Sequence, residues 1–166
     1  MENYQPPYHL TEKILTLSTE ISRLVSVINV QQGSHAPKLR KSSRIRTIHS
    51  SLAIEQNTLS IDQVKTLANG KTVIGPVREI REVRNAITAY DEIENLDPYS
   101  EKDLLKTHAL MMNGLTEQSG VYRTKGVGVY HGQQVIHMAP PAKIVPELMG
   151  RLIDWTEHAS VHMLVR

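Results

Sequence analysis

One short stretch, from Ser51 to Asn57, combines a hydroxyl and a carboxylate at a spacing that suits chemistry. Ser51 and Glu55 are four residues apart, so a helix places both on one face. A carboxylate near the C-terminus of a helix opposes the macrodipole, which favours cations there. An arginine from elsewhere would remove that penalty, because its guanidinium binds a carboxylate through two parallel hydrogen bonds. The alternative interpretation is a solvated glutamate beside a serine, and the spacing alone favours this alternative.

A second stretch, from Tyr122 to Met138, is rich in glycine and valine, and its polar and apolar residues partly alternate. This pattern predicts a short β-hairpin that reverses at His131-Gly132. A lone hairpin is marginally stable, so it must pack on helices or serve a partner. Its exposed edges can accept an extended peptide as an additional strand. The alternative interpretation is a structural hairpin that covers the core.

The histidines show no pattern typical of a metal site. His131 and His137 lie on the predicted hairpin, whereas His158 and His162 are four residues apart but separated by a break in the helical pattern. The sequence contains no cysteine, which excludes disulfides and thiolate ligands. We therefore expect no metal site among these residues.

Basic residues crowd one stretch of the chain, although the formal net charge is only +2. The cluster consists of Lys38, Arg40, Lys41, Arg44 and Arg46. These residues spread around their predicted helix, and no aromatic residue lies between them. The pattern favours a solvated surface over a nucleic-acid interface.

The spacing of apolar residues predicts a mainly α fold with about six helices and one β-hairpin. Helices are expected over residues 11–30, 37–55, 60–69, 77–97, 100–115 and 144–158. Thr11 and Ser60 are expected to cap their helices, and Ser100 with Asp103 is expected to form a capping pair. The wide apolar stripe of the last helix, which includes Leu148, Leu152 and Trp155, is expected to face a core.

The length of 166 residues fits one domain, with 40% apolar and 22% charged residues. The start of the sequence lacks the pattern of a secretory signal, and no apolar run approaches the roughly 20 residues of a membrane helix. We therefore expect a soluble cytoplasmic protein without membrane contact. A further apolar helix begins at Val161 and stops within two turns at Arg166. This ending predicts that the chain is cut from a longer protein.

Three landmarks, in this order, resemble the Fic family of AMP-transferases, in the subgroup whose inhibitory helix precedes the catalytic core. Residues 51–57 are similar to the inhibitory pattern of Ser or Thr, three residues, Glu, and then Gly or Asn. Residues 120–123, with the hairpin and Pro140-Pro141, resemble the flap that orients the target. Residues 162–166 resemble the start of the helix that leads into the active-site loop. The resemblance covers residues 10–166, and it implies the front portion of a Fic fold.

The family signature, His-Pro-Phe-x-x-Gly-Asn-Gly-Arg-x-x-Arg, is absent from this sequence. In the family, its His is the base, an acidic residue holds magnesium, and its backbone and Arg residues bind the ATP phosphates. The resemblance therefore implies ATP and Mg²⁺ as cofactors of the longer protein. It implies no catalytic residue in this chain, and neither cofactor is expected to bind tightly to the chain alone.

By the same resemblance, Glu55 is the inhibitory carboxylate, and Ser51 orients it through a hydrogen bond. In the family, this carboxylate pairs with the last Arg of the signature and keeps the γ-phosphate from settling productively. The resemblance also places a run of hairpin residues near the nucleotide and the target: Val135, Ile136, His137 and Met138.

One residue departs from the family pattern, because Gln56 follows Glu55 where Gly or Asn is usual. A left-handed helix end costs a residue with a β-carbon about 1 kcal/mol. Asn57 tolerates that conformation better, so we expect it to adopt the left-handed conformation and to end the helix one residue later.

Residues 1–60 are thus expected to form a helical region with the inhibitory helix, and residues 61–166 a partial Fic core with the flap. The first hypothesis is the N-terminal part of a protein adenylyltransferase, inactive alone, that docks a target protein through the flap. The second is a non-enzymatic interaction module that binds targets or inserts its inhibitory helix into another Fic protein. A helical nucleic-acid binder ranks last, and self-association into a homo-oligomer stays open.

Overall fold

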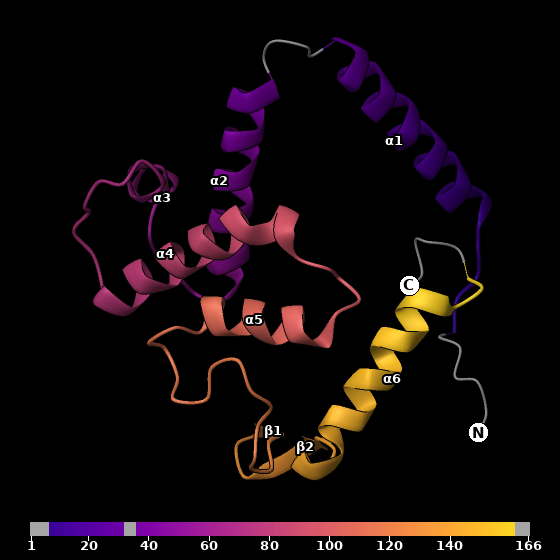
Figure 1. Cartoon of the computed structure of the whole chain (residues 1–166), viewed down its shortest axis with the longest axis vertical. Helices are drawn as coiled ribbons and strands as arrows, with labels where there is room; N and C mark the ends of the chain where they lie inside the picture. Colours follow the sequence, from indigo (N-terminus) through magenta and orange to yellow (C-terminus); the bar gives the residue numbers. More distant parts are fainter. Residues whose placement is uncertain (1–6, 32–35, 162–166) are drawn as a thin grey trace. The chain divides into compact units, whose positions relative to one another are not determined.

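The computed structural model describes the backbone of residues 7–31 and 36–161 and the side chains of residues 7–28 and 39–161. This part of the chain contains six α-helices, two short 3-10 helices and one antiparallel hairpin (Figure 1). The mainly α fold with a single hairpin is therefore confirmed. The elements are α1 (Glu12–Gln31), α2 (Ala36–Ile54), α3 (Ile61–Ala68), α4 (Val77–Glu92), η1 (Ile93–Asn95), α5 (Glu101–Met111), β1 (Gly128–His131), β2 (Gln134–Met138), η2 (Ala142–Ile144) and α6 (Val145–His158).

The chain divides into two compact units, residues 1–43 with 160–166 and residues 44–159. The division falls inside α2, and the sequence-based division at residue 60 stays a prediction. The further helix expected from Val161 lies almost wholly outside the described residues. None of the helices in the described part combines the length and apolarity needed to cross a bilayer.

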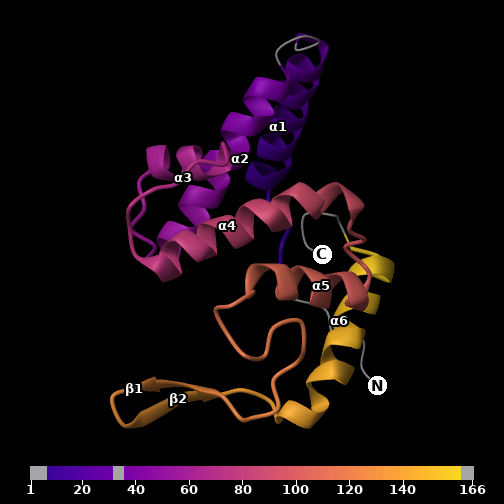
Figure 2. The same ribbon diagram turned by 60° about the vertical axis from the view of Figure 1, so that its left-hand side comes forward.

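The core of the second unit lies where the last half of α2 meets α3 and α4 (Figure 2). Its most deeply buried side chains are Ile48, Val64 and Val83, one from each of these helices. Fully burying an aliphatic side chain of this size stabilises a fold by about 1.5–3 kcal/mol. The remaining members of the cluster are Ile45, Leu59, Leu67 and Ala86. This core therefore anchors the last turns of α2 against α4.

Local capping agrees with the sequence at three helix starts. Thr11 Oγ1 accepts from the amide of Ile14 at 3.3 Å. Ser60 and Gln63 form a capping box, in which the Gln63 amide donates to Ser60 Oγ at 3.3 Å and the Ser60 amide donates to Gln63 Oε1 at 2.8 Å. Ser100 Oγ accepts from the Asp103 amide at 3.2 Å. The predicted starts of α1, α3 and α5 are thus confirmed within one or two residues.

Helix α5 ends at Met111, earlier than the predicted end near residue 115. The side chain of Asn85 contributes to the early end, because its Nδ2 donates to Met111 O at 3.0 Å and to Asn113 O at 2.9 Å. These bonds satisfy carbonyls that the helix no longer pairs. A contact across 26 residues thus accompanies the end of the helix. The Asn113-Gly114 pair is a local stop signal at the same place, because Gly114 has a φ of 67°.

The hairpin occupies residues 128–138, so it is shorter than the predicted stretch from Tyr122. Gly132 begins the two-residue turn with a φ of 60°, which fits a type II′ turn. The segment before β1 stays irregular because Arg123 holds it, donating to Lys125 O at 2.9 Å and to Pro140 O at 2.5 Å. The register shifts between Val129 and Tyr130, because Val129 pairs with His137 but Tyr130 pairs with Val135. Ile136 is therefore the extra residue, and the bulge lies in β2.

The apolar stripe of α6 is only partly covered within its unit, where Met149, Ile153 and Trp155 are half-buried. No residue of α6 is buried, and Leu148 and Leu152 are 39% and 49% exposed. Within its unit, α6 packs on α5 and η2 only, whereas the buried cluster forms between α2, α3 and α4. The stripe therefore lacks full cover among the described residues of that unit.

Candidate functional site

The end of α2 is closed by a Schellman motif, the six-residue turn that often terminates helices. The Asn57 amide donates to Leu52 O at 3.0 Å, and the Gln56 amide donates to Ala53 O at 3.1 Å. Gln56 has a φ of 66° and is the non-glycine residue that adopts a left-handed conformation in the described chain. The expectation that Asn57 would adopt it, and extend the helix, is therefore wrong.

The side chain of Asn57 explains why Gln56 accepts the left-handed conformation. Asn57 is only 9% exposed, and its Nδ2 donates to Glu79 O at 3.1 Å and to Glu82 Oε2 at 2.9 Å. Its Oδ1 accepts from the Leu59 amide at 3.2 Å. A buried amide with these partners needs its present backbone position, since an unpaired buried polar group costs about 1–3 kcal/mol. The strain therefore falls on the residue before it.

Thr58 adds a second connection between the end of α2 and the first turns of α4. Its amide donates to Glu79 Oε2 at 2.5 Å, and its hydroxyl donates to the same oxygen at 2.8 Å. We call the set of Asn57, Thr58, Glu79 and Glu82 the α2–α4 clamp. Its hydrogen bonds involve two carboxylates, and charge-assisted bonds of this kind are stronger than neutral ones.

Glu55 and Ser51 both lie at the surface of α2, near its end. Neither side chain forms a hydrogen bond or ion pair with the described residues, so the expected bond between Ser51 and Glu55 is not formed among them. The Glu55 carboxylate is placed by the backbone of the helix end and is open to an external cation. The inhibitory roles of the two residues stay predictions.

The hairpin residues Val135, Ile136, His137 and Met138 are all exposed. His137 pairs with Val129, and Met138 pairs with Gly128, in the antiparallel register. Successive strand residues point to opposite faces, so both faces of the hairpin present apolar side chains to solvent. Figure 2 shows the hairpin extending away from α4 and α5. The predicted contacts of these residues with nucleotide and target stay untested.

The segment that leads into the hairpin is anchored on α5. The Gly120 amide donates to His108 Nδ1 at 2.9 Å, and a β-carbon on Gly120 would lie 2.8 Å from Ala109 Cβ. The hydroxyl of Tyr122 is enclosed near the Glu101 carboxylate, but its geometry does not meet that of a hydrogen bond to any described residue. Burial, together with the nearby Glu101 carboxylate, raises the pKa of Tyr122 to about 12. The segment at residues 120–122, which we call the root of the hairpin, is therefore packed on α5, whereas most residues of the two strands are exposed.

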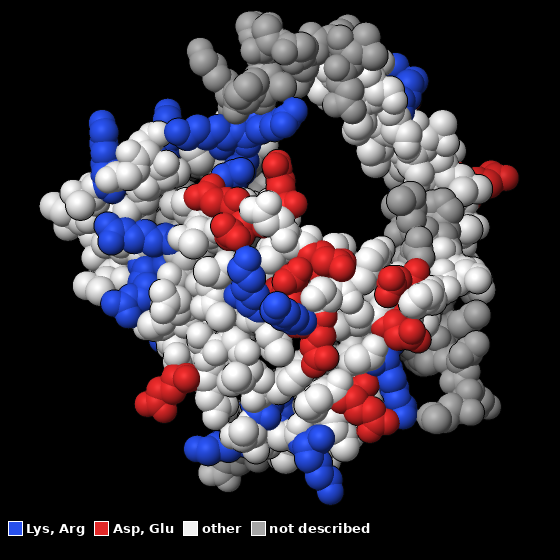
Figure 3. Space-filling view, in the orientation of Figure 1, with Lys and Arg blue, Asp and Glu red and all other residues white. Residues whose placement is uncertain are grey.

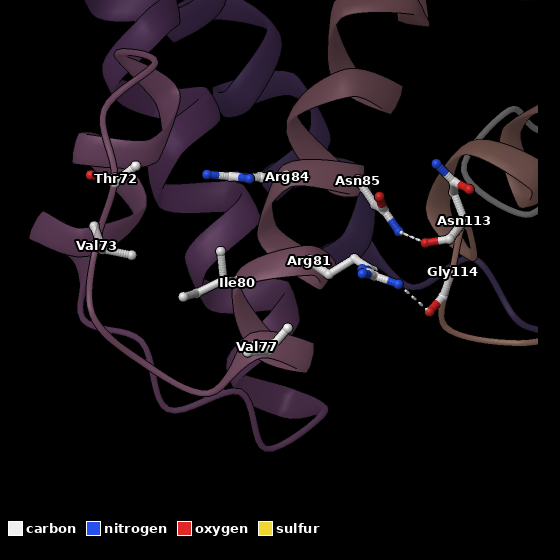
Figure 4. Close-up of a pocket in the computed structure, with 9 residues that line it drawn as sticks. All are labelled: Thr72, Val73, Val77, Ile80, Arg81, Arg84, Asn85, Asn113 and Gly114. Carbon is white, nitrogen blue, oxygen red and sulfur yellow. Dashed lines mark hydrogen bonds between the residues drawn. The ribbon is translucent and has the colours of Figure 1, made fainter.

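A pocket of about 540 Å³ lies beside α4 and was missed by the sequence analysis (Figure 4). Arg81 donates to Gly114 O at 2.8 Å at one end of it, whereas Arg84 points toward Thr72 and Val73 at the other end. The two guanidinium groups therefore do not converge on one anion. None of the predicted site residues lines the pocket, which is formed by Thr72, Val73, Val77, Ile80, Arg81, Arg84, Asn85, Asn113 and Gly114.

The side chain of Lys38 lies outside the described residues, and the other members of the basic cluster are divided between the two units. Arg44 pairs with Asp91 at 2.5 Å, which links α2 to α4, and Arg40 and Arg46 are exposed. In the unit of residues 44–159, acidic and basic side chains lie side by side on the viewed face (Figure 3). This mixture supports a solvated surface. No group of three or more potential metal ligands occurs among the described residues.

Comparison with known proteins identifies the kind of protein. No family model matches the sequence, and no curated protein matches it. Solved structures do match, among them the crystal structure of a Fic family protein from Desulfovibrio desulfuricans G20. The two chains are 47% identical, with a TM-score of 0.84 over 98% of this chain.

The sequence identity and the similar backbone together show that this chain has a mainly α, Fic-type fold. The chain is related to the Fic family, as the three sequence landmarks indicate. It spans 50% of the length of the Desulfovibrio protein.

Proposed function

We propose that this chain is the regulatory and target-docking portion of a protein adenylyltransferase, which transfers AMP from ATP to a protein hydroxyl group. The 47% identity to a Fic family protein over 98% of the chain carries this proposal. The catalytic signature is not among these 166 residues, so transfer requires residues that this chain does not contain. ATP and Mg²⁺ belong to the longer protein, and a cysteine-free chain fits the reducing, ATP-rich cytoplasm.

In this proposal, Glu55 inhibits transfer by competing with the γ-phosphate of ATP for one arginine of the signature. The exposed position of Glu55 and its lack of a partner among the described residues support this role, because the carboxylate is available to an external guanidinium. Tethering the carboxylate to a fixed helix end raises its effective concentration at the site. The inhibited state is then the resting state of the longer protein.

The target docks on the hairpin by adding a strand to a free edge. Among the described residues, each strand of the hairpin pairs with one other strand, so each leaves one edge for an additional strand. Main-chain hydrogen bonds would supply affinity, and the exposed side chains of Val135 and Ile136 would select the target sequence. The irregular segment at Arg123 keeps the hairpin attached while its strands receive the target.

Labelled ATP, Mg²⁺ and candidate target proteins test the proposal. The isolated chain should transfer no label, whereas the longer protein should transfer it slowly and the Glu55→Gly variant much faster. Glu94→Gly, which changes another exposed glutamate, serves as the control and should match the unmodified protein. Turnover by the isolated chain, or an unchanged rate in Glu55→Gly, would contradict the proposal.

The exposed hairpin also favours a second candidate, a non-enzymatic module that captures a partner without nucleotide. A pull-down with this chain distinguishes the two. Stable capture in the absence of ATP, lost when Val135 and Ile136 are both changed to Thr, supports the module. Capture that depends on a longer protein with bound ATP supports the transferase.

A further inference from the structure

We propose that Glu79 and Glu82 of α4 are positioning residues for Glu55, and that breaking the α2–α4 clamp activates the transferase. This inference rests on the proposed inhibitory role of Glu55. Glu55 has no side-chain partner among the described residues, so something else must set its place. The clamp residue Asn57 follows it by two positions and is buried against α4.

The Schellman motif transmits the position of Asn57 to Glu55. The bond from the Asn57 amide to Leu52 O closes a ring of backbone atoms that contains Glu55. Moving Asn57 must therefore move Glu55 or break the helix end. The clamp thus acts on the inhibitory carboxylate through the main chain, without touching its side chain.

The strained backbone of Gln56 indicates that the clamp holds this helix end in a single conformation. A left-handed Gln costs free energy, and such residues persist only where the surrounding contacts hold them. The clamp provides these contacts through the two bonds of Asn57 Nδ2 and the two bonds of Thr58 to Glu79. Once these bonds are lost, the left-handed conformation loses its support, and the last turn of α2 can unwind.

Glu82 connects the clamp to the rest of α4. Its side chain is only 18% exposed, and its Oε1 accepts from Arg78 Nε at 3.1 Å while Oε2 accepts from Asn57. Glu79 lies in the first turn of α4, where the helix dipole favours a carboxylate. Contacts within α4 therefore fix both carboxylates, and these carboxylates in turn position Asn57 and Thr58. Helix α4 is the rigid reference against which Glu55 is set.

The test measures AMP transfer by the longer protein that contains this chain. Glu82→Ala should raise basal transfer by roughly tenfold, the effect of losing one charge-assisted hydrogen bond. Asn57→Ala should raise it by at least as much, because it also loses the bond to Glu79 O and the bond from the Leu59 amide. Neither should exceed Glu55→Gly, which removes the inhibitory group itself. The double variant should be no more active than Asn57→Ala, because both changes remove the same bond. Glu82→Ala also keeps the Asn57 bond to Glu79 O, so it serves where Asn57→Ala fails to fold.

Asn85→Ala is the matched control. Asn85 is also a buried asparagine with two hydrogen bonds, but it bonds to the end of α5 instead of α2. It should destabilise the protein to a similar degree without raising basal transfer. If Asn85→Ala activates as strongly as Asn57→Ala, general loosening explains the effect and the positioning role is wrong.

Hydrogen exchange on the isolated chain separates failure of the clamp from failure of the proposed function. Asn57→Ala should speed exchange of the amides at positions 56 and 57 by at least tenfold, while Asn85→Ala leaves them unchanged. Unchanged exchange in Asn57→Ala would overturn the clamp regardless of any activity. Activation by Glu55→Gly without activation by Asn57→Ala would overturn the positioning role alone. An inert Glu55→Gly would overturn the inhibitory role itself, and the regulatory inference with it.

Discussion

The side-chain amide of Asn57 donates to the carboxylate of Glu82 at 2.9 Å, across 25 residues of sequence. This bond joins the end of α2 to the second turn of α4. It thereby fixes the backbone conformation of the last turn of α2, at residues 52–57. Glu55, two residues before Asn57, therefore takes its position from α4. The predictions below test this helix end and the anchored root of the hairpin.

Replacing Asn57 by Ala should lower the free energy of unfolding by about 2–3 kcal/mol, because it leaves the half-buried Glu82 carboxylate and the Glu79 carbonyl without their donor. Urea denaturation followed by circular dichroism measures the change. Thr58→Val, which loses one hydroxyl bond but keeps the amide bond to Glu79, should cost about 1 kcal/mol. Equal losses in the two variants would show that the Asn57 side chain has no special place in the helix end.

Replacing Gln56 by Gly should raise the free energy of unfolding by about 0.5–1 kcal/mol, because glycine adopts a φ of 66° without strain. Greater freedom of glycine in the unfolded chain offsets part of this gain. The shift of the urea midpoint measures the change. Gln56→Ala keeps the β-carbon and the strain, so it should show no such gain; a loss of stability in Gln56→Gly would argue against strain at this position.

Replacing Gly120 by Ala should destabilise the fold by about 1–3 kcal/mol through overpacking and backbone strain. The new β-carbon would lie 2.8 Å from Ala109 Cβ, and Gly120 has a φ of 73°. Gly126→Ala is the matched control, since its β-carbon would meet nothing within 4 Å. Thermal melts compare the two variants, and equal melting temperatures would mean that Gly120 does not anchor the hairpin root on α5.

The free energy of unfolding should fall at high pH, because Tyr122 has a raised pKa in the folded chain. The pKa of a tyrosine in an unfolded chain is about 10, whereas burial raises the pKa of Tyr122 to about 12 in the fold. Below the unfolded pKa both states keep the proton, and the full contribution to stability is present. Between the two values the unfolded state releases its proton first, so stability falls as the pH rises through this window.

The variant Tyr122→Phe should flatten this part of the pH dependence, because phenylalanine does not titrate. Urea denaturation at pH 9, 10, 11 and 12 (about one unit apart, spanning the window) compares it with the unmodified chain. At neutral pH its stability should be nearly unchanged, since the geometry of the Tyr122 hydroxyl does not meet that of a hydrogen bond to any described residue. Parallel curves for the two proteins up to the highest pH would contradict the raised pKa.

Local features of the sequence were sufficient to predict most of the helices, the caps at Thr11, Ser60 and Ser100, and the single hairpin. Capping and helical periodicity depend on neighbours within four residues, so one segment contains all the information they need. The landmarks around Glu55 and the hairpin likewise indicated the Fic family, which the match to the Desulfovibrio protein supports.

The tertiary structure decided what depends on distant partners. The apolar stripe of α6 is typical of a buried helix, but periodicity shows only that a face is apolar and not whether another element covers it. Gln56 adopts the left-handed conformation that Asn57 tolerates better, because burial against Glu79 and Glu82 holds Asn57 where it is. Contacts across more than 20 residues outweigh a local preference of about 1 kcal/mol. The sequence by itself thus determined which residue types occupy the helix end, and packing against α4 determined the conformation that they adopt.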